Sequence, residues 1–142
     1  MKKGGAPIIG DGKARWNNIH IEDLCDVCRL LVNRVVVRDT SADIWGAKGY
    51  MFVENGGHVW GELSQTIANS AESLGYISNT EGYAVDKDEA LNLAGFEAVS
   101  WGLNSRGKAE RTKQYLGWKP TRPSIENSIK EILEDERKRL SR

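Results

Sequence analysis

The sequence has no excess of charge of either sign. Among its 142 residues lysine and arginine number 20, as do aspartate and glutamate, so the net charge at pH 7 is zero. A neutral chain has no long-range field that draws it to nucleic acid or to an anionic membrane. We therefore expect neither nucleic acid nor membrane as a partner.

Long apolar runs are also lacking. No run approaches the roughly 20 residues that a membrane-spanning helix needs. The basic start "MKKGGAPIIGDG" lacks an apolar segment long enough for a secretory signal. The sequence therefore predicts a cytoplasmic protein, and its length predicts a single domain over residues 1–142.

Cysteine and histidine are scarce, with two of each. Cys25 and Cys28 form a C-x-x-C pair, which is typical of redox or zinc sites. A zinc site needs about two more ligands, and His20 and His58 stand apart from any second ligand pair. We therefore expect no metal site, and we interpret both cysteines as buried small apolar residues of one helix face.

The residues that are present predict an α/β chain that is mostly helical, with a few short strands and about five helices. A hairpin is predicted near residues 7–21, because Asp11 and Gly12 suit the positive φ of a tight turn. The apolar run "GYMFVENGG" predicts a buried strand near residues 49–54.

Apolar spacing and capping residues place the helices. The first is expected to begin at Glu22 and Asp23 and to run to about Val37. The second helix is expected to end at Gly75, and the third to begin after an Asp86 cap and to end at Gly95. The fourth is expected to end at Gly117, with Trp118 folded back onto its last turn, and the last helix to begin near Ser124.

Four segments carry a resemblance to a known family: "RWNNIHIEDL", "GYMFVENG", "NSRGKAERTKQYLGWKP" and "RPSIENSI". In this order they resemble the C-terminal, substrate-binding part of an extended short-chain dehydrogenase/reductase of the NAD-dependent epimerase/dehydratase family. The resemblance implies a partial Rossmann-like substrate domain that lacks the N-terminal half where NAD or NADP binds. A full-length relative would use NAD or NADP.

Two signatures of that family are missing. Gly56, Gly57 and Gly61 lie between a strand and a helix, but their spacing does not fit a dinucleotide turn, so we expect no cofactor in this chain alone. Tyr-x-x-x-Lys occurs at Tyr83 and at Tyr115, but the first match straddles the Asp86 cap and the second crosses Gly117. We interpret both as chance matches, and the catalytic residues are unknown.

Two segments offer candidate substrate contacts. Arginine suits bidentate recognition of an anion, and tryptophan supplies a flat apolar wall. The resemblance implies that the first segment lines a substrate cleft, and the second concentrates an aromatic ring, an amide and two cations. The candidates are Arg15, Trp16, Asn18 and His20, and Trp101, Asn104, Arg106 and Lys108. The structural alternatives are an exposed arginine, a core tryptophan, a histidine whose ring is satisfied by a backbone carbonyl, and a cation paired with Glu62 or Glu110. Trp45, Trp60 and Trp118 are interpreted as packing residues.

Three functions follow as hypotheses. The first is the substrate-binding portion of an NAD(P)-dependent oxidoreductase or epimerase, present as a fragment or a short gene product, that binds a possibly anionic small molecule and cannot transfer hydride alone. The second is a truncated relative recruited as a cofactor-independent lyase, isomerase or cyclase in a biosynthetic pathway. The third is a non-catalytic interaction module, with homo-oligomers formed through apolar surface on the first helix and on "GYMFVENG".

Overall fold

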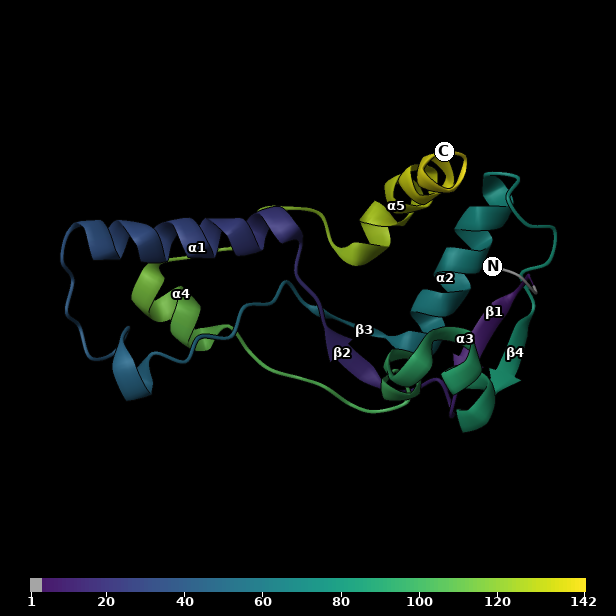
Figure 1. Ribbon diagram of the computed structural model, residues 1–142, viewed down its shortest axis with the longest axis horizontal. Helices are drawn as coiled ribbons and strands as arrows, with labels where there is room; N and C mark the ends of the chain where they lie inside the picture. The colour runs from purple at the N-terminus through teal and green to yellow at the C-terminus, as the bar shows by residue number, and fades with distance from the viewer. Residues whose placement is uncertain (1–3) are drawn as a thin grey trace. The chain divides into compact units, whose positions relative to one another are not determined.

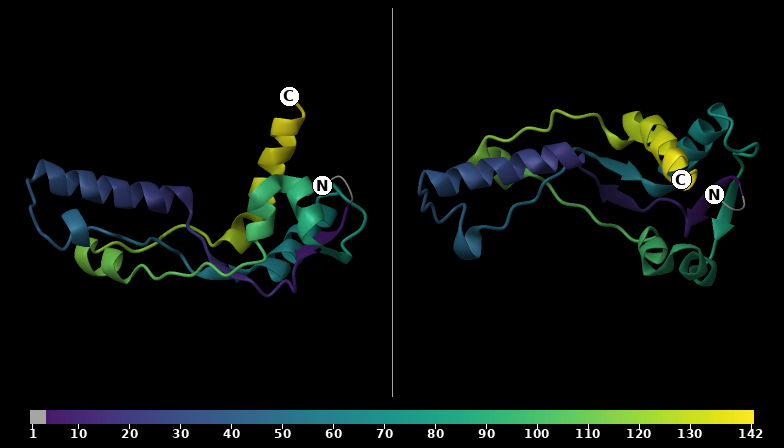
Figure 2. Two further views of the ribbon diagram at one scale, coloured as in Figure 1. Left: turned by 60° about the horizontal axis from the view of Figure 1, so that its bottom comes forward. Right: turned by 45° about the horizontal axis from the view of Figure 1, so that its top comes forward.

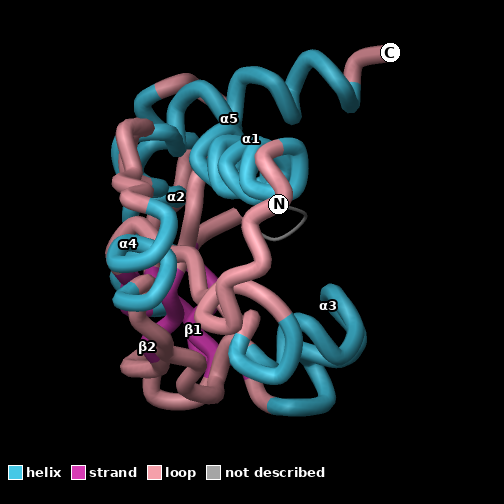
Figure 3. Tube along the Cα trace, turned by 90° about the vertical axis from the view of Figure 1, so that its left-hand side faces the viewer, coloured by secondary structure: helices cyan, strands magenta, loops and turns pink. Residues whose placement is uncertain are grey.

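The computed structural model describes residues 4–142, and the basic start of the chain at residues 1–3 lies outside the described residues. The described part is α/β and mostly helical, with short strands among five longer helices, which confirms the predicted class (Figure 3). Its elements are β1 (Ala6–Ile9), β2 (Arg15–Asn17), α1 (Ile21–Val36), a 3-10 turn (Gly46–Lys48), β3 (Gly57–Val59), α2 (Trp60–Ser73), β4 (Gly82–Val85), α3 (Lys87–Ser100), α4 (Glu110–Leu116) and α5 (Ile125–Leu140) (Figure 1).

The chain forms two compact units that each combine separate segments. Unit 1 consists of the described part of Met1–Trp16 with Gly57–Arg106 and Ile125–Arg142, and unit 2 consists of Asn17–Gly56 with Gly107–Ser124. No helix among residues 4–142 is both long and apolar enough to cross a membrane. Whether the two units behave as one domain stays a prediction.

Unit 1 is built on a parallel strand pair covered by helices. Strand β1 pairs with β4 in a register that runs from Ala6 opposite Gly82 to Ile9 opposite Val85. Helix α2 packs against β1, and α5 packs against α2 (Figure 1). One apolar cluster joins β4 to α3 through Val85, Ala90 and Ala98, and Ile9 packs against it.

The hairpin predicted near residues 7–21 is wrong. The turn itself forms, since Gly12 has a φ of 70° and its N–H donates to Ile9 O at 3.2 Å. However, β1 pairs with β4 and β2 pairs with β3. The turn residues specify a local reversal only, whereas these strands find their backbone partners more than 35 residues away in the sequence.

A close approach of two glycines holds the turn against helix α2. Gly61 N donates to Gly12 O at 2.9 Å, and a Cβ at Gly61 would lie 2.8 Å from that same oxygen. No larger residue fits at Gly61 without movement of the Gly12 backbone. This contact fixes where α2 begins relative to β1.

Unit 2 packs helix α1 against helix α4 (Figure 2). Its core contains Val27, Ile44, Ala109, Leu116 and Trp118. The C-cap Gly117 has a φ of 65° and ends α4 as predicted, and Trp118, 2% exposed, folds back into the core.

The buried strand predicted near residues 49–54 is wrong. Residues 49–54 form no strand and have no strand partner, and Tyr50 and Phe52 are exposed. Side chains of α4 replace a neighbouring strand: Arg111 Nε donates to Tyr50 O at 3.3 Å, and the Thr112 hydroxyl donates to Phe52 O. The prediction assumed that the apolar run is buried on both faces, whereas only Met51 and Val53 of this run pack on the core.

The cysteines predicted to be buried are exposed. In α1 the buried residues are Asp23 and Val27, whereas Cys25 and Cys28 lie on the opposite side. Asp23 is fully buried because its carboxylate caps the segment after α4, where it accepts from Thr121 N at 2.9 Å and from Arg122 N at 3.2 Å. The apolar spacing alone did not show which of the two faces meets the core.

Candidate functional site

A pocket in unit 1 is the candidate functional site. It is lined by Pro7, Ile9, Trp60, Ser64, Ile67 and Trp101, and its volume is about 200 Å³. Strand β1 supplies two of these residues, and α2 supplies Trp60, Ser64 and Ile67, which are four and three residues apart and so share one helix face. An apolar cavity of about 150 Å³ holds one benzene molecule, so this pocket has room for a small ring system.

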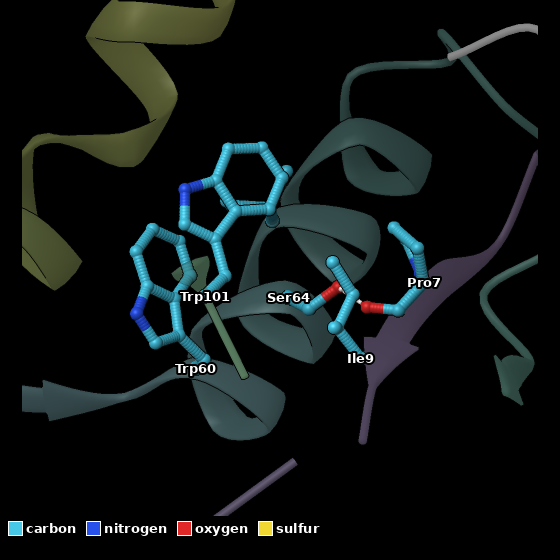
Figure 4. Close-up of a pocket in the computed structure, with 6 residues that line it drawn as sticks. Pro7, Ile9, Trp60, Ser64 and Trp101 are labelled. Carbon is cyan, nitrogen blue, oxygen red and sulfur yellow. Dashed lines mark hydrogen bonds between the residues drawn. The ribbon is translucent and has the colours of Figure 1, made fainter. Parts of the chain in front are cut away.

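Two stacked tryptophans form one wall of the pocket. The rings of Trp60 and Trp101 lie 5.0 Å apart between centroids, with 20° between their planes. Figure 4 shows these rings to one side of the pocket, with Pro7 and Ile9 across from them. The Ser64 hydroxyl donates to Pro7 O at 2.8 Å, which ties α2 to β1 and occupies the hydroxyl proton.

Two further rings hold Trp60 in place. Trp16 meets Trp60 edge to face at 5.4 Å, and His58 does so at 4.7 Å. Trp16 is fixed in turn, because its Nε1 donates to Leu103 O at 2.8 Å. Such edge-to-face contacts contribute about 0.5–1.5 kcal/mol each beyond buried area. The aromatic wall is therefore built before any ligand arrives.

The pocket is apolar in its electrostatics as well. None of its six lining residues ionises near neutral pH. The His58 ring, which contacts Trp60, is 8% exposed, and its burial lowers its pKa, while the charge of Glu126 acts in the opposite direction. Burial thus favours the neutral form of His58, and none of the six pocket residues carries a charge that would favour a charged ligand.

The structure brings two predicted candidate segments together. Arg15 N donates to the side-chain oxygen of Asn104 at 3.0 Å, and Ser105 N donates to Arg15 O at 2.9 Å. Trp16 forms a parallel bridge with Ser105. These contacts place Trp16 and Trp101 on the same aromatic cluster around Trp60, although the two segments are far apart in the sequence.

The other candidates do not line this pocket. Arg15, Asn104 and Arg106 are exposed in unit 1. Because side chains alternate along a strand, Arg15 leaves β2 on the face opposite Trp16. Their roles as substrate contacts stay predictions.

In unit 2 the remaining three candidates have structural contacts. His20 is the N-cap of α1, and its Nδ1 accepts from Glu22 N at 3.2 Å. The backbone N–H of Asn18 donates to Gly56 O at 3.3 Å. Lys108, whose side chain is 81% exposed, lies 3.8 Å from Glu110, one of the partners expected as its structural alternative. Asn17 was not a candidate, yet its side chain joins Gly56 O to Gly107 N.

The glycine turn before α2 does not fit a dinucleotide phosphate. A phosphate binds a helix start through backbone N–H groups that have no partner. Here Trp60 N donates to Ala14 O and Gly61 N donates to Gly12 O, both at 2.9 Å. The first two donors of α2 are thus already used by the chain itself.

Both Tyr-x-x-x-Lys matches lie across element boundaries, as expected. Tyr83 belongs to β4, whereas Lys87 begins α3 after the Asp86 cap, whose carboxylate accepts from Glu89 N at 2.9 Å. Tyr115 lies in α4, and Gly117 ends that helix before Lys119. Neither pair shares a helix, so neither has the geometry of the family's dyad. Among the described residues no group of three or more acidic, histidine or cysteine side chains is arranged to hold a metal ion.

Five of the six pocket residues were not predicted. Trp60 was interpreted as a packing residue, and Pro7, Ile9, Ser64 and Ile67 were not singled out. The spacing of Trp60, Ser64 and Ile67 was a usable signal, because it marks one helix face. The contribution of Pro7 and Ile9 depends on the β1–β4 pairing, which the sequence did not indicate.

Comparison with known proteins gives one similar sequence. No family model matches the chain, and no solved structure matches it. A curated protein from Acremonium sp, named Oxidase ucsJ, is 35% identical over 146 residues, which cover 99% of this chain and 42% of that protein. The chain thus spans less than half the length of this relative.

Proposed function

We propose that this chain is the substrate-binding part of an oxidoreductase and that the pocket in unit 1 holds a flat, apolar portion of a small molecule. The observation that carries the proposal is the stack of Trp60 on Trp101 in a pocket of about 200 Å³. A pre-built indole wall offers stacking to a ring system at little cost in side-chain entropy.

Two further observations support an oxidoreductase. The relative that is 35% identical is named an oxidase. The four segments quoted above resemble the substrate-binding part of NAD-dependent epimerases and dehydratases. In this proposal the cofactor is bound by a region other than α2, because the first two N–H donors of that helix are used by Ala14 and Gly12.

A cofactor-independent lyase, isomerase or cyclase has less support. Such chemistry needs a general acid or base within hydrogen-bond reach of the reacting group. The pocket is lined by Pro7, Ile9, Ser64 and three apolar or indole side chains, and the Ser64 proton is donated to Pro7 O. This arrangement suits binding better than proton transfer.

Isothermal titration calorimetry of the 142-residue chain tests the proposal. We expect 2-naphthol, a neutral bicyclic probe, to bind one site with a Kd on the order of 0.1 mM, given the modest free energy that about ten ligand atoms supply. We expect no heat from NAD, NADH, NADP or NADPH below 1 mM, on the order of the weakest affinity that calorimetry resolves. Micromolar binding of any of the four dinucleotides would overturn the proposal that this chain binds the substrate and that another region binds the cofactor.

A charged probe tests the predicted anion contacts. 2-Naphthoate has the same ring system with a carboxylate, so it tests whether Arg15 or Arg106, neither of which lines the pocket, reaches the anionic group of a ligand bound there. If the substrate is anionic, Arg15→Ala or Arg106→Ala weakens the binding of 2-naphthoate and leaves the affinity for 2-naphthol unchanged. Equal affinities in both variants would remove these arginines from the site without affecting the pocket itself.

A further inference from the structure

Helix α1 has a continuous apolar stripe on its exposed side. Successive residues of a helix are turned by about 100° around its axis, and on this basis the six side chains of the stripe fall within an arc of roughly 100° around α1. Four of them are large apolar side chains that stay exposed: Ile21 at 66%, Val32 at 59%, Val35 at 60% and Val36 at 74%. The stripe consists of Ile21, Cys25, Cys28, Val32, Val35 and Val36.

The spacing of the stripe is that of a helix-pairing seam. Its first five members are separated by four, three, four and three residues, and no charged residue falls within the arc. Helix α1 is a single uninterrupted helix in both views of Figure 2. The opposite face, with Asp23 and Val27, is already used by the core of unit 2. The stripe is therefore additional to the face that folds the unit.

We propose that the stripe pairs with the same stripe of a second copy of this chain, with the two α1 helices antiparallel. Charge on the exposed side of α1 is divided, because Glu22 and Asp26 lie in its first half, whereas Arg29 lies in its second half and Arg38 lies just beyond its end. Arg34 is not part of this surface, since it binds Asp39 and Tyr115 O within the unit. Antiparallel pairing sets the acidic half of each helix against the basic half of the other and opposes their dipoles. Parallel pairing would place like charges together.

The existing ion pairs do not prevent this arrangement. Asp26 and Arg29 are 3.3 Å apart, with side chains 39% and 64% exposed, and Glu22 and Arg122 are 2.9 Å apart with similar exposure. Exposed pairs of this kind contribute little to stability, so exchanging partners costs little. Arg38 is exposed at the end of the helix, where it can meet the acidic start of the second copy.

The size and shape of the stripe fit a copy of itself. A 16-residue helix is about 24 Å long, and six partly exposed side chains on each copy bury on the order of 1,000 Å² in total, near the lower limit for a specific interface. The side chains are β-branched or small, so the stripe has neither a large knob nor a deep hole that would require a partner of another shape. We therefore expect a weak dimer that forms reversibly.

The cysteines lie at the middle of the stripe. Cys28 is next to the midpoint of Ile21–Val36, so antiparallel helices with coincident midpoints bring Cys28 of one copy to Cys28 of the other. Two thiols there can form one intermolecular disulfide, giving two electrons to an added oxidant such as copper phenanthroline and releasing two protons. This reaction reports the orientation of the helices as well as their contact.

Sedimentation velocity over a concentration series tests the proposal without reference to the pocket. Under reducing conditions we expect a monomer–dimer equilibrium in which Val32→Glu raises the dissociation constant at least tenfold. Asn33→Glu is the matched control, because it adds the same charge at the next position, which is exposed and outside the stripe. Circular dichroism checks that both variants keep the helix content of the parent chain.

Oxidation supplies the second readout. We expect copper phenanthroline to produce a covalent dimer that Cys28→Ser reduces at least fivefold. A monomer at every concentration, a dimer that Val32→Glu leaves intact, or oxidation that gives only a Cys25–Cys28 bridge within one copy would each overturn the proposal. None of these outcomes alters the expected binding of 2-naphthol, so the dimer and the proposed function fail independently.

Discussion

Trp60 and Trp101 stack at 5.0 Å although they come from helices α2 and α3 and are 41 positions apart in the sequence. Trp60 stands at the first position of α2, and Trp101 is the C-cap of α3. Their positions at helix ends leave the rings on the border of the core, where they wall a pocket instead of filling it. This relationship converts two tryptophans into a candidate binding surface.

Loss of one ring should weaken binding while the fold persists. Truncation of an aromatic ring that stacks on a ligand costs about 1–3 kcal/mol, so we expect Trp101→Ala to weaken the binding of 2-naphthol by roughly 5- to 160-fold in calorimetry. Trp45→Phe is the control, because Trp45 packs on the core of unit 2 and does not line the pocket. Equal affinities of the two variants would mean that the stack is structural only.

Arg111 should be a main determinant of the stability of unit 2. Its guanidinium donates to Asp43 O at 2.6 Å, to Lys48 O at 2.7 Å and to Tyr50 O at 3.3 Å, so one side chain holds a long irregular segment. We expect Arg111→Met to lower the free energy of unfolding by about 2–4 kcal/mol, since three carbonyls lose a charged donor. Urea denaturation measures this change, with Lys108→Met as a control near zero.

Asp23 provides a second test of the same unit. Its buried carboxylate accepts the N–H groups of Thr121 and Arg122, and the fold brings these residues together across almost 100 positions. We expect Asp23→Ala to cost about 2–3 kcal/mol, because buried donors are left without an acceptor. Asp26→Ala, on the exposed side of α1, should cost less than 1 kcal/mol. A reversed order in thermal melts would contradict this description of unit 2.

Stability should fall in mild acid because of His58. Burial lowers the pKa of His58 below its ordinary value, so the unfolded chain takes up the proton first as the pH falls. The free energy of unfolding should therefore decrease as the pH falls through about 6.5 and continue to decrease until the folded pKa is passed. Denaturation of the parent chain and of His58→Gln at pH 8.0 and 5.5 measures the difference, and an equal loss in both would exclude His58 as the cause.

Protonation of Glu54 should cause a second loss of stability at a lower pH. Burial raises the pKa of Glu54, but donation from the N–H groups of Gly56 and Ala109 and the charge of Lys113 outweigh it, so the pKa is lowered. The stabilisation by this carboxylate is present above its ordinary range and is lost as the pH falls through its lowered pKa. Glu54→Gln should remove that part of the acid transition of unit 2 in thermal melts.

Local signals predicted the helices well. The Asp86 cap and the Gly75 and Gly117 stops are positions where one residue type satisfies one backbone requirement, and all three lie where expected. Gly95 also breaks the helix, with a φ of 68°, but a further helical segment continues to Ser100. Such boundaries depend on a few neighbouring residues, which explains why the sequence alone was sufficient.

Features that depend on distant partners were not predictable in this way. The turn at Gly12 does not show that β1 will pair with β4, and the run around Met51 does not show that α4 will supply its hydrogen-bond donors. The exposed position of Cys25 depends on which face of α1 meets Trp118 and Leu116. For the same reason, the candidate residues included Trp101 but omitted Trp60, which completes the stack.

The indole N–H signals of the five tryptophans offer the most direct test of the pocket. In a ¹H–¹⁵N correlation spectrum titrated with 2-naphthol, we expect the Trp60 and Trp101 signals to move together with one dissociation constant. The Trp45 and Trp118 signals, which belong to the core of unit 2, should stay in place. Shifts confined to Trp45 and Trp118, or spread evenly over all five signals, would contradict the assignment of the unit 1 pocket as the ligand site.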